Sequence, residues 1–266
     1  MVFINELRID QLCYNYSIGI TEPKFAILED GTQVITKLMN GPEGNLVLFN
    51  EYLCYRLAIL VDIPMPHSGI CIFDESTEIQ DLGIANPDNY GRAFYSEYMP
   101  KTTKLLPSII DKITNKNDFL KIILFDHIIF NTDRNAGNLL VRFYINDISL
   151  KVIDHTHVFI NQAIWDANCL RRAMKENDLM KTNVMEENKY LYDMFIHNIS
   201  VTKELLEKES LVFKNRINSD IMIGIIKSIP DEWKPKQKDI DALVEYIMYR
   251  IQNIDTIIST ILTYIR

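Results

Sequence analysis

The spacing of hydrophobic positions changes once along the chain. Up to about residue 100, short runs rich in β-branched and aromatic residues alternate with turn residues. Beyond that point, apolar residues recur mainly at the spacing of amphipathic helices. The pattern predicts a small lobe that mixes strands with a helix, followed by a larger helical lobe.

The clearest hairpin signal is FAILEDGTQVITKL, residues 25–38. Two β-rich runs are joined there through Asp30-Gly31, the strongest short signal for a hairpin turn. Lys37 lies at the end of the second run. GRAFYSEYMP, residues 91–100, is expected to be the last strand of this lobe and to run into a connector.

A helix is expected between these strands. Asn45 can cap its start, and Pro64 and Pro66 lie beyond its end. Apolar residues form two stripes at helical spacing, and Glu51 lies at the N-terminal end of the second. The stripes are Phe49, Leu53, Leu57 and Leu60, and Cys54, Ala58 and Val61. We therefore expect a helix covered on two sides, with a carboxylate on one of them.

Two more helices are predicted in the second half. DFLKIILFDHIIF has apolar residues on its buried faces, and apolar positions from Ile240 to Ile258 continue one long amphipathic stripe. Asp126 lies on an otherwise apolar face of the first of these helices. We expect it to be a buried acceptor that holds the loop that follows.

Composition and charge exclude some classes of function. Of 266 residues, 47% are hydrophobic and 24% are charged, as in ordinary globular proteins. A net charge of −8 argues against a general nucleic-acid binder or a basic membrane-surface protein. The four cysteines lack zinc-site spacing, and neither a signal peptide nor a membrane-spanning apolar run is recognisable. We expect a cytoplasmic protein without a membrane partner.

The segment FNTDRNAGNLL, residues 130–140, concentrates amide and carboxylate side chains. Taken alone it is typical of a polar turn. Two β-like runs follow, NLLVRFY and SLKVID, and a turn centred on Asn146 would place Asn138 opposite Asp154. Opposed residues of a hairpin lie close enough for two oxygen-bearing side chains to share one cation, and Asp133 would lie beside it.

This is the layout that phosphoryl transfer requires. A carboxylate orients the attacking hydroxyl, and an Asn and an Asp bind metal on the phosphates. The reaction also needs a cation on the nucleotide phosphates and an anion that holds this cation. Lys37 on a strand and Glu51 on the following helix supply these two charges in the expected order.

Several motifs resemble the HipA-like kinases. TKLMNGPEGNLVLFNEYLCYRLAILVDIPMP resembles that family's strand lysine, glycine-containing loop and N-E-Y helix ending in a P-x-P turn. FDHIIFNTDRNAGNLL resembles its catalytic loop, LKVIDHTHVF its metal motif, and SIPDEW the tail of its short, stand-alone members. The resemblance covers about residues 15–160 and 228–258.

The resemblance implies an α+β, bilobal protein-kinase-like fold. It implies a small mixed β/α N-lobe at residues 1–95, an interlobe connector at 96–101 and a mainly helical C-lobe at 102–266. The roles that it implies are Lys37 on the α/β-phosphates, Glu51 pairing it, Asp133 as catalytic base, Asn138 and Asp154 on Mg²⁺, and the backbone of Glu97, Tyr98 and Met99 on adenine.

The chain also departs from the family pattern. It has no G-x-G-x-x-G, and the nearest candidate for a loop covering the phosphates is Ser17-Ile18-Gly19. Asn135 stands where many relatives have His. His155 follows Asp154 in place of Phe-Gly, so the activation-segment logic of typical protein kinases is not assumed.

Three functions remain open at this stage. The first is an ATP- and Mg²⁺-dependent kinase whose acceptor, by resemblance, is a protein Ser or Thr. The second is a small-molecule kinase on the same fold, and the third is a pseudokinase or nucleotide-binding interaction module. The sequence leaves three roles equally open for Arg134, namely supporting Asp133, binding phosphate or forming a structural ion pair. His155 and His157 suggest a zinc site, but no third ligand is evident.

Overall fold

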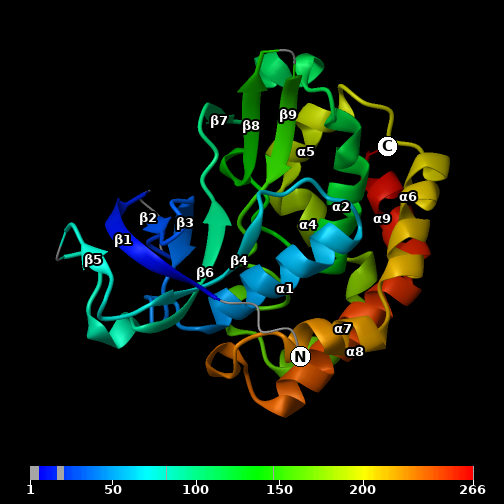
Figure 1. Cartoon of the computed structure of the whole chain (residues 1–266). Helices are drawn as coiled ribbons and strands as arrows, with labels where there is room; N and C mark the ends of the chain where they lie inside the picture. Colours follow the sequence, from blue (N-terminus) through cyan, green and yellow to red (C-terminus); the bar gives the residue numbers. More distant parts are fainter. Residues whose placement is uncertain (1–5, 17–20, 82, 146, 266) are drawn as a thin grey trace. The chain divides into compact units, whose positions relative to one another are not determined.

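The computed structural model describes residues 6–16, 21–81, 83–145 and 147–265 (Figure 1). These residues form two compact units. The sheet unit holds the described residues up to Tyr52 together with Pro66–Met99 and Ile229–Lys234. The helical unit holds Leu53–Met65, Pro100–Ser228 and the described residues from Pro235 onward.

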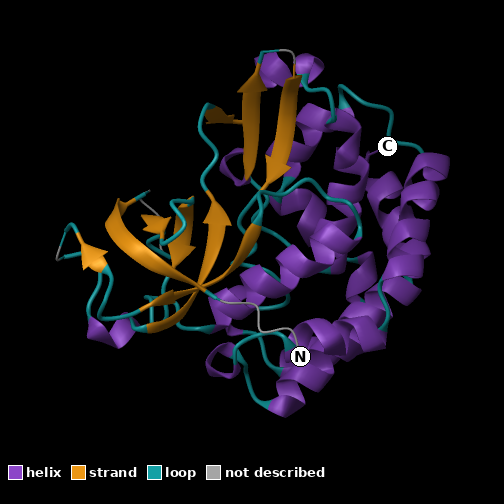
Figure 2. Cartoon of the chain, in the orientation of Figure 1, coloured by secondary structure: helices purple, strands orange, loops and turns teal. Residues whose placement is uncertain are grey.

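The sheet unit is built from strands that alternate in sequence with turns (Figure 2). Its strands are β1 (Leu7–Asn15), β2 (Lys24–Leu28), β3 (Gln33–Lys37), β4 (Ser68–Phe73), β5 (Glu78–Ile79) and β6 (Gly91–Glu97). They pair in the order β2-β3-β6-β4-β1-β5, and β1 also pairs with β2. The extra pairing closes the sheet on itself around an apolar interior.

The core of this unit comes from alternate positions of the strands, as expected when one face of each strand is buried. Its buried members are Ile9, Leu12, Ala26, Leu28, Val34, Leu38, Cys71, Phe73, Ile84, Ala93 and Tyr95. The four cysteines of the chain are buried thiols, as small core residues often are.

The predicted first hairpin is confirmed. β2 and β3 pair antiparallel, with Ile27 opposite Gln33. Gly31 has a φ of 84°, which glycine adopts without steric cost, and its N–H donates to the Leu28 carbonyl over 2.8 Å. The Asp30 carboxylate accepts from the Thr32 N–H at 2.9 Å. The turn brings Lys37 to the end of β3, beside Phe94 of β6.

The helix predicted after this hairpin is α1 (Leu46–Leu60). It begins directly after Asn45, whose carbonyl accepts from the N–H of Leu48 and whose side chain accepts from the N–H of Asn40. Both predicted stripes are buried, apart from partial exposure of Leu60. Glu51 is only 3% exposed, so a charge is enclosed on the second stripe as expected.

The helical unit contains the remaining elements. Its helices are α2 (Phe119–Ile128), α3 (Ala167–Lys175), α4 (Asn183–Glu187), α5 (Lys189–Ile196), α6 (Lys203–Arg216), α7 (Ser219–Lys227), α8 (Gln237–Gln252) and α9 (Ile254–Ile265). Its strands are β7 (Thr102–Lys104), β8 (Leu139–Tyr144) and β9 (Asp147–Val152), paired in the order β7-β8-β9. No helix in the described part of the chain is both long and apolar enough to cross a membrane.

The prediction of one long C-terminal helix was wrong in one respect. The apolar stripe is divided between α8 and α9, which are separated at Asn253. Asn253 has a φ of −106° and a ψ of 25°, outside the helical range, and its side chain donates to the Tyr249 carbonyl at 2.8 Å. Such a side-chain bond to the preceding turn competes with helix continuation.

The register predicted for the β8–β9 hairpin was also wrong, by one residue. Tyr144 pairs with Asp147, whereas the prediction placed it opposite Ile148. Asn146 itself lies outside the described residues. The ladder continues to Leu139 opposite Val152, and the Ile153 N–H then donates to the Asn138 carbonyl at 3.0 Å. Asn138 is therefore opposite Ile153 and not opposite Asp154.

Candidate active site

In the sheet unit, Lys37 and Glu51 form a buried ion pair. The ammonium group of Lys37, at the end of β3, donates to a carboxylate oxygen of Glu51 on α1. Their side chains are 11% and 4% exposed. Because an isolated buried charge is costly, each of these residues fixes the other in place. The structure thus brings together the two charges that the sequence placed on a strand and the next helix.

The connector candidates also lie in the sheet unit. Glu97 ends β6 and donates its N–H to the His67 carbonyl at 2.8 Å. The N–H of Tyr98 donates to the Gln33 carbonyl, also at 2.8 Å, and Met99 is 9% exposed. Ser17 and Gly19, the candidates for a loop covering the phosphates, lie outside the described residues.

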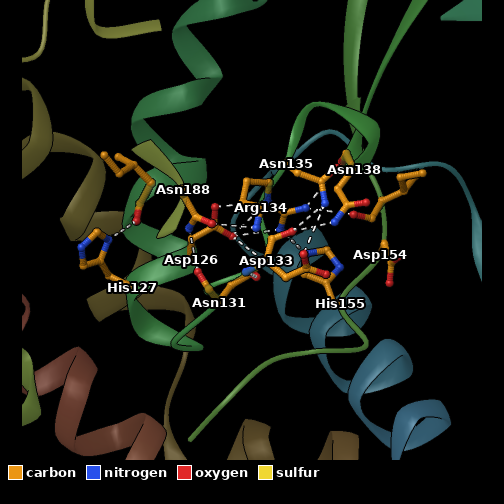
Figure 3. A network of polar contacts seen from close by, with 12 residues as sticks. Asp126, His127, Asn131, Asp133, Arg134, Asn135, Asn138, Asp154, His155 and Asn188 are labelled. Carbon is orange, nitrogen blue, oxygen red and sulfur yellow. Dashed lines mark hydrogen bonds and ion pairs between the residues drawn. The ribbon is translucent and has the colours of Figure 1, made fainter. Parts of the chain in front are cut away.

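In the helical unit, a buried carboxylate organises the loop that follows α2. Asp126 is fully buried and accepts from the Arg134 guanidinium, with Nη2 at 2.9 Å and Nε at 3.1 Å. It also accepts from Asn131 Nδ2 at 3.0 Å (Figure 3). The hydroxyl of Tyr192 donates to it, also at 3.0 Å. The prediction that Asp126 is a buried acceptor holding this loop is confirmed.

Arg134 is the structural ion-pair partner of Asp126. Burial disfavours its charge, but the neighbouring Asp126 carboxylate outweighs this and raises the pKa of the Arg134 guanidinium. Its Nη1 donates to the Ile153 carbonyl at 2.9 Å, and Nη2 lies 2.9 Å from His155 Nε2. Of the three roles that the sequence left open for Arg134, the structure shows the ion pair.

The backbone of the loop is held by amide side chains. Asn188, from the segment between α4 and α5, accepts from the Arg134 N–H and donates to the Asn131 carbonyl, both at 2.8 Å. Asn131 in turn accepts from the Asp133 N–H at 2.9 Å. Asn135 accepts from the Gly137 N–H at 2.8 Å. Asn131 and Asn135 therefore support the backbone, as typical turn residues do.

Asp133 projects from this loop and keeps 42% of its side chain exposed. A donor lies near each of its carboxylate oxygens. Asn135 Nδ2 lies 3.3 Å from Oδ1, and His157 Nδ1 lies 3.4 Å from Oδ2. A rigid backbone and a partly exposed carboxylate are what a group needs to meet a substrate hydroxyl.

Asn138 remains part of the same arrangement despite the different register. It ends the short 3-10 helix Ala136–Asn138 before β8, and its Nδ2 donates to the Asp133 carbonyl at 2.7 Å. This bond fixes the orientation of the amide. Asp154 follows β9 with a left-handed φ of 61°, and its Oδ1 lies 3.3 Å from the Thr156 N–H. The prediction that Asn138 and Asp154 lie opposite each other in the hairpin is thus wrong. Arg134, from the loop of Asp133, nevertheless bonds to Ile153, the residue directly before Asp154.

Sequence reasoning missed Asn188 and Tyr192. Both are more than 50 residues away from the loop that they hold, and neither lies in a motif. His157 was considered only as a metal ligand, whereas the structure places it against Asp133. An Asn or Tyr within a helical region carries no periodic signal for such contacts, so only the fold reveals them.

The chain matches a known protein family. A family model described as HipA-like kinase matches residues 9–260. A search of curated protein sequences returned no match.

Among solved structures, the chain is similar to the Helicobacter pylori proinflammatory kinase CtkA. The TM-score is 0.58 at 10% identity, and the alignment covers 95% of each chain. It is also similar to the Golgi casein kinase with Mn/ADP bound, with a TM-score of 0.54 at 12% identity over 97% of this chain and 73% of the other. At these identities the likeness shows the fold, which is α+β and protein-kinase-like, as expected from the sequence.

Proposed function

The chain belongs to the HipA-like kinase family, and from this premise we propose that it transfers the γ-phosphoryl group of ATP to a Ser or Thr hydroxyl of a protein. A kinase-type phosphotransferase is the class to which family and fold assign it. The nucleotide, the divalent ion and the acceptor are the parts that we propose.

The observation that carries the proposal is the loop between α2 and β8. It is anchored to Asp126 from within and presents Asp133 and Asn138 side by side, joined by the bond from Asn138 Nδ2 to the Asp133 carbonyl. In our proposal Asp133 orients the acceptor hydroxyl and takes its proton as the oxygen attacks phosphorus. Positioning and electrostatics supply most of the rate in this chemistry.

The Lys37–Glu51 pair supports a nucleotide site in the sheet unit. Lys37 would offset negative charge on the α/β-phosphates, and Glu51 holds its ammonium group in place. The proposed site further includes Ser17 and Gly19 over the phosphates and the backbone of residues 97–99 at adenine. In this proposal residues 1–95 are the nucleotide-binding lobe, 96–101 the connector and 102–266 the helical lobe.

Asn138 and Asp154 fit a magnesium site by their chemistry. Mg²⁺ prefers carboxylate or amide oxygens together with phosphate and water. The bond from Asn138 Nδ2 to the loop backbone turns the nitrogen inward and leaves the amide oxygen as the ligand atom. When bound, the ion would neutralise charge on the β- and γ-phosphates. Buried thiols suit a reducing compartment, so we place the activity in the cytoplasm.

The proposal is tested with γ-labelled ATP and Mg²⁺, with the purified protein alone and with a lysate of its own cells. We expect transfer to a protein band, and a loss on the order of 10²- to 10⁴-fold in Asp133→Ala. Asp154→Ala should abolish transfer. Asp220→Ala, an exposed carboxylate on α7, is the matched control and should retain it.

Other outcomes separate the rival functions. Label that accumulates only in the small-molecule fraction would replace the protein acceptor with a metabolite. Nucleotide binding without transfer to any acceptor would make the chain a binding module. Transfer that persists in both Asp133→Ala and Asp154→Ala would overturn the assignment of the site.

A further inference from the structure

The segment Ile229–Lys234 belongs to the sheet unit, although α7 before it and α8 after it belong to the helical unit. It contains the short 3-10 helix Asp231–Trp233. Ile229 and Trp233 are 2% and 1% exposed, and Trp233 is among the largest fully buried side chains. The chain therefore leaves the helical unit briefly and buries a tryptophan in the other unit.

Trp233 contacts α1, which carries Glu51, and β6, which pairs with the strand of Lys37. Its ring meets the ring of Tyr52 edge-on, with centroids 6.5 Å apart and planes at 70°. Its indole Nε1 donates to the Arg92 carbonyl of β6 at 3.2 Å. Tyr52 directly follows Glu51 on α1, and β6 is the strand that pairs with the Lys37 end of β3.

Glu232 adds contacts at the start of α1. Its carbonyl accepts from Asn45 Nδ2 at 3.4 Å, and Asn45 directly precedes the helix. Its carboxylate accepts from Arg92 Nη1 at 3.1 Å, while Arg92 Nε donates to Glu6 at 2.8 Å. The segment thus contacts the residue directly before α1 and again the residue beside Glu51.

We infer that residues 229–234 form a clamp that sets the position of α1 and thereby holds Glu51 against Lys37. The catalytic consequence rests on the proposed function, whereas the contact itself does not. Successive helix residues point about 100° apart, so a ring that packs on Tyr52 fixes the rotation of the helix and the direction of Glu51. A displacement of about 1 Å is enough to spoil a catalytic ion pair.

The clamp is tested without nucleotide, by the rate at which a small amine reagent such as acetic anhydride modifies Lys37, followed by mass spectrometry. Only the neutral amine reacts, and a carboxylate partner keeps it charged. Glu51→Gln removes the carboxylate and so gives the rate of Lys37 modification when the ion pair is broken. We expect Trp233→Ala to raise the wild-type rate about threefold to tenfold, which lies in the lower part of the range that coupling between neighbouring residues produces.

One control and one second clamp variant complete the test. Trp165→Ala removes a tryptophan that is 3% exposed in the helical unit and should leave the Lys37 rate at the wild-type value. Glu232→Ala removes a partly exposed pair and should raise the rate in the same direction, which keeps the test decisive if Trp233→Ala does not fold. An unchanged Lys37 rate in the folded clamp variants would overturn the inference.

A second measurement distinguishes positioning from general destabilisation. If Trp233 acts through Glu51, the double variant Trp233→Ala/Glu51→Gln transfers phosphate no more slowly than Glu51→Gln alone. If the rate reductions of the two single variants multiply in the double variant, the clamp does not act through the Lys37–Glu51 pair. If the wild type transfers no phosphate at all, the proposed function fails, and the Lys37 modification rates still decide the clamp.

Discussion

Arg134 and Asp126 form an ion pair in which neither side chain is exposed, with Arg134 Nη2 2.9 Å from Asp126 Oδ1. The same guanidinium donates to the Ile153 carbonyl, directly before Asp154. One residue therefore joins α2, the loop of Asp133 and the end of the β8–β9 hairpin. The fixed fork of an arginine suits such a junction better than the single charge of a lysine.

Breaking this pair should cost stability and activity together. Asp126→Asn leaves a buried guanidinium without its counter-charge, and we expect the free energy of unfolding to fall by about 3 to 5 kcal/mol. Arg134→Lys should reduce transfer, because one ammonium cannot reach both Asp126 and Ile153. Urea denaturation and the labelled-ATP assay measure the two effects.

The matched control for this prediction is an exposed ion pair. Lys189 and Asp193 are one helical turn apart on α5, with side chains 57% and 40% exposed. Asp193→Asn should change the free energy of unfolding by less than about 1 kcal/mol. A cost as small as this in Asp126→Asn would show that the buried pair does not organise the loop.

Asn138 provides a test of the metal assignment. Asn138→Ala removes both the amide oxygen and the bond from Nδ2 to the Asp133 carbonyl. We expect the Mg²⁺ concentration that gives half-maximal transfer to rise about 10- to 100-fold, as for other altered metal sites. The exposed Asn168→Ala on α3 should keep the wild-type requirement. A reduced rate at an unchanged Mg²⁺ requirement would remove Asn138 from the metal site.

Features that depend on local sequence were predictable. Asp30-Gly31 specifies its turn through glycine's positive φ, and the two stripes of α1 follow from helical spacing. The buried role of Asp126 followed from a carboxylate on an apolar face, because a buried charge needs partners.

Features that depend on one residue of register or on distant partners were not predictable in the same way. A shift of one residue in the pairing of β8 with β9 changes every opposed pair of the hairpin, so Asn138 lies opposite Ile153 and not opposite Asp154. Asn253 interrupts an apolar stripe that is otherwise continuous. Asn188 and Tyr192 hold the Asp133 loop from far along the chain, and no periodicity marks such partners.

His127 should make the protein acid-sensitive. Burial lowers the pKa of its imidazole to about 3 from an ordinary 6.5. Above pH 6.5 the ring is neutral in both states. Below pH 6.5, the unfolded chain binds a proton at this residue that the folded chain does not bind. As the pH is lowered from 6.5 to about 3, the free energy of unfolding therefore decreases by about 1.4 kcal/mol per pH unit.

Replacing this histidine tests the origin of that slope. His127→Phe should flatten the fall in the free energy of unfolding between pH 6 and about pH 4, measured by urea titrations at each pH. His197→Phe, an exposed position at the end of α5, should keep the wild-type slope. Equal slopes in wild type and His127→Phe would contradict the prediction.

His157 is expected to position the carboxylate of Asp133. It is the neighbour of Oδ2 at 3.4 Å, as Asn135 is of Oδ1 at 3.3 Å, so the two side chains limit rotation of the carboxylate. Because the hydroxyl must meet an oriented oxygen, His157→Ala should lower kcat about tenfold. The KM for ATP should not change, since we propose that Lys37, and not His157, contacts the nucleotide. His157→Gln, which keeps a donor, should recover part of kcat, and His197→Gln should have no effect. A rise in the KM for ATP at constant kcat would place His157 at the nucleotide instead.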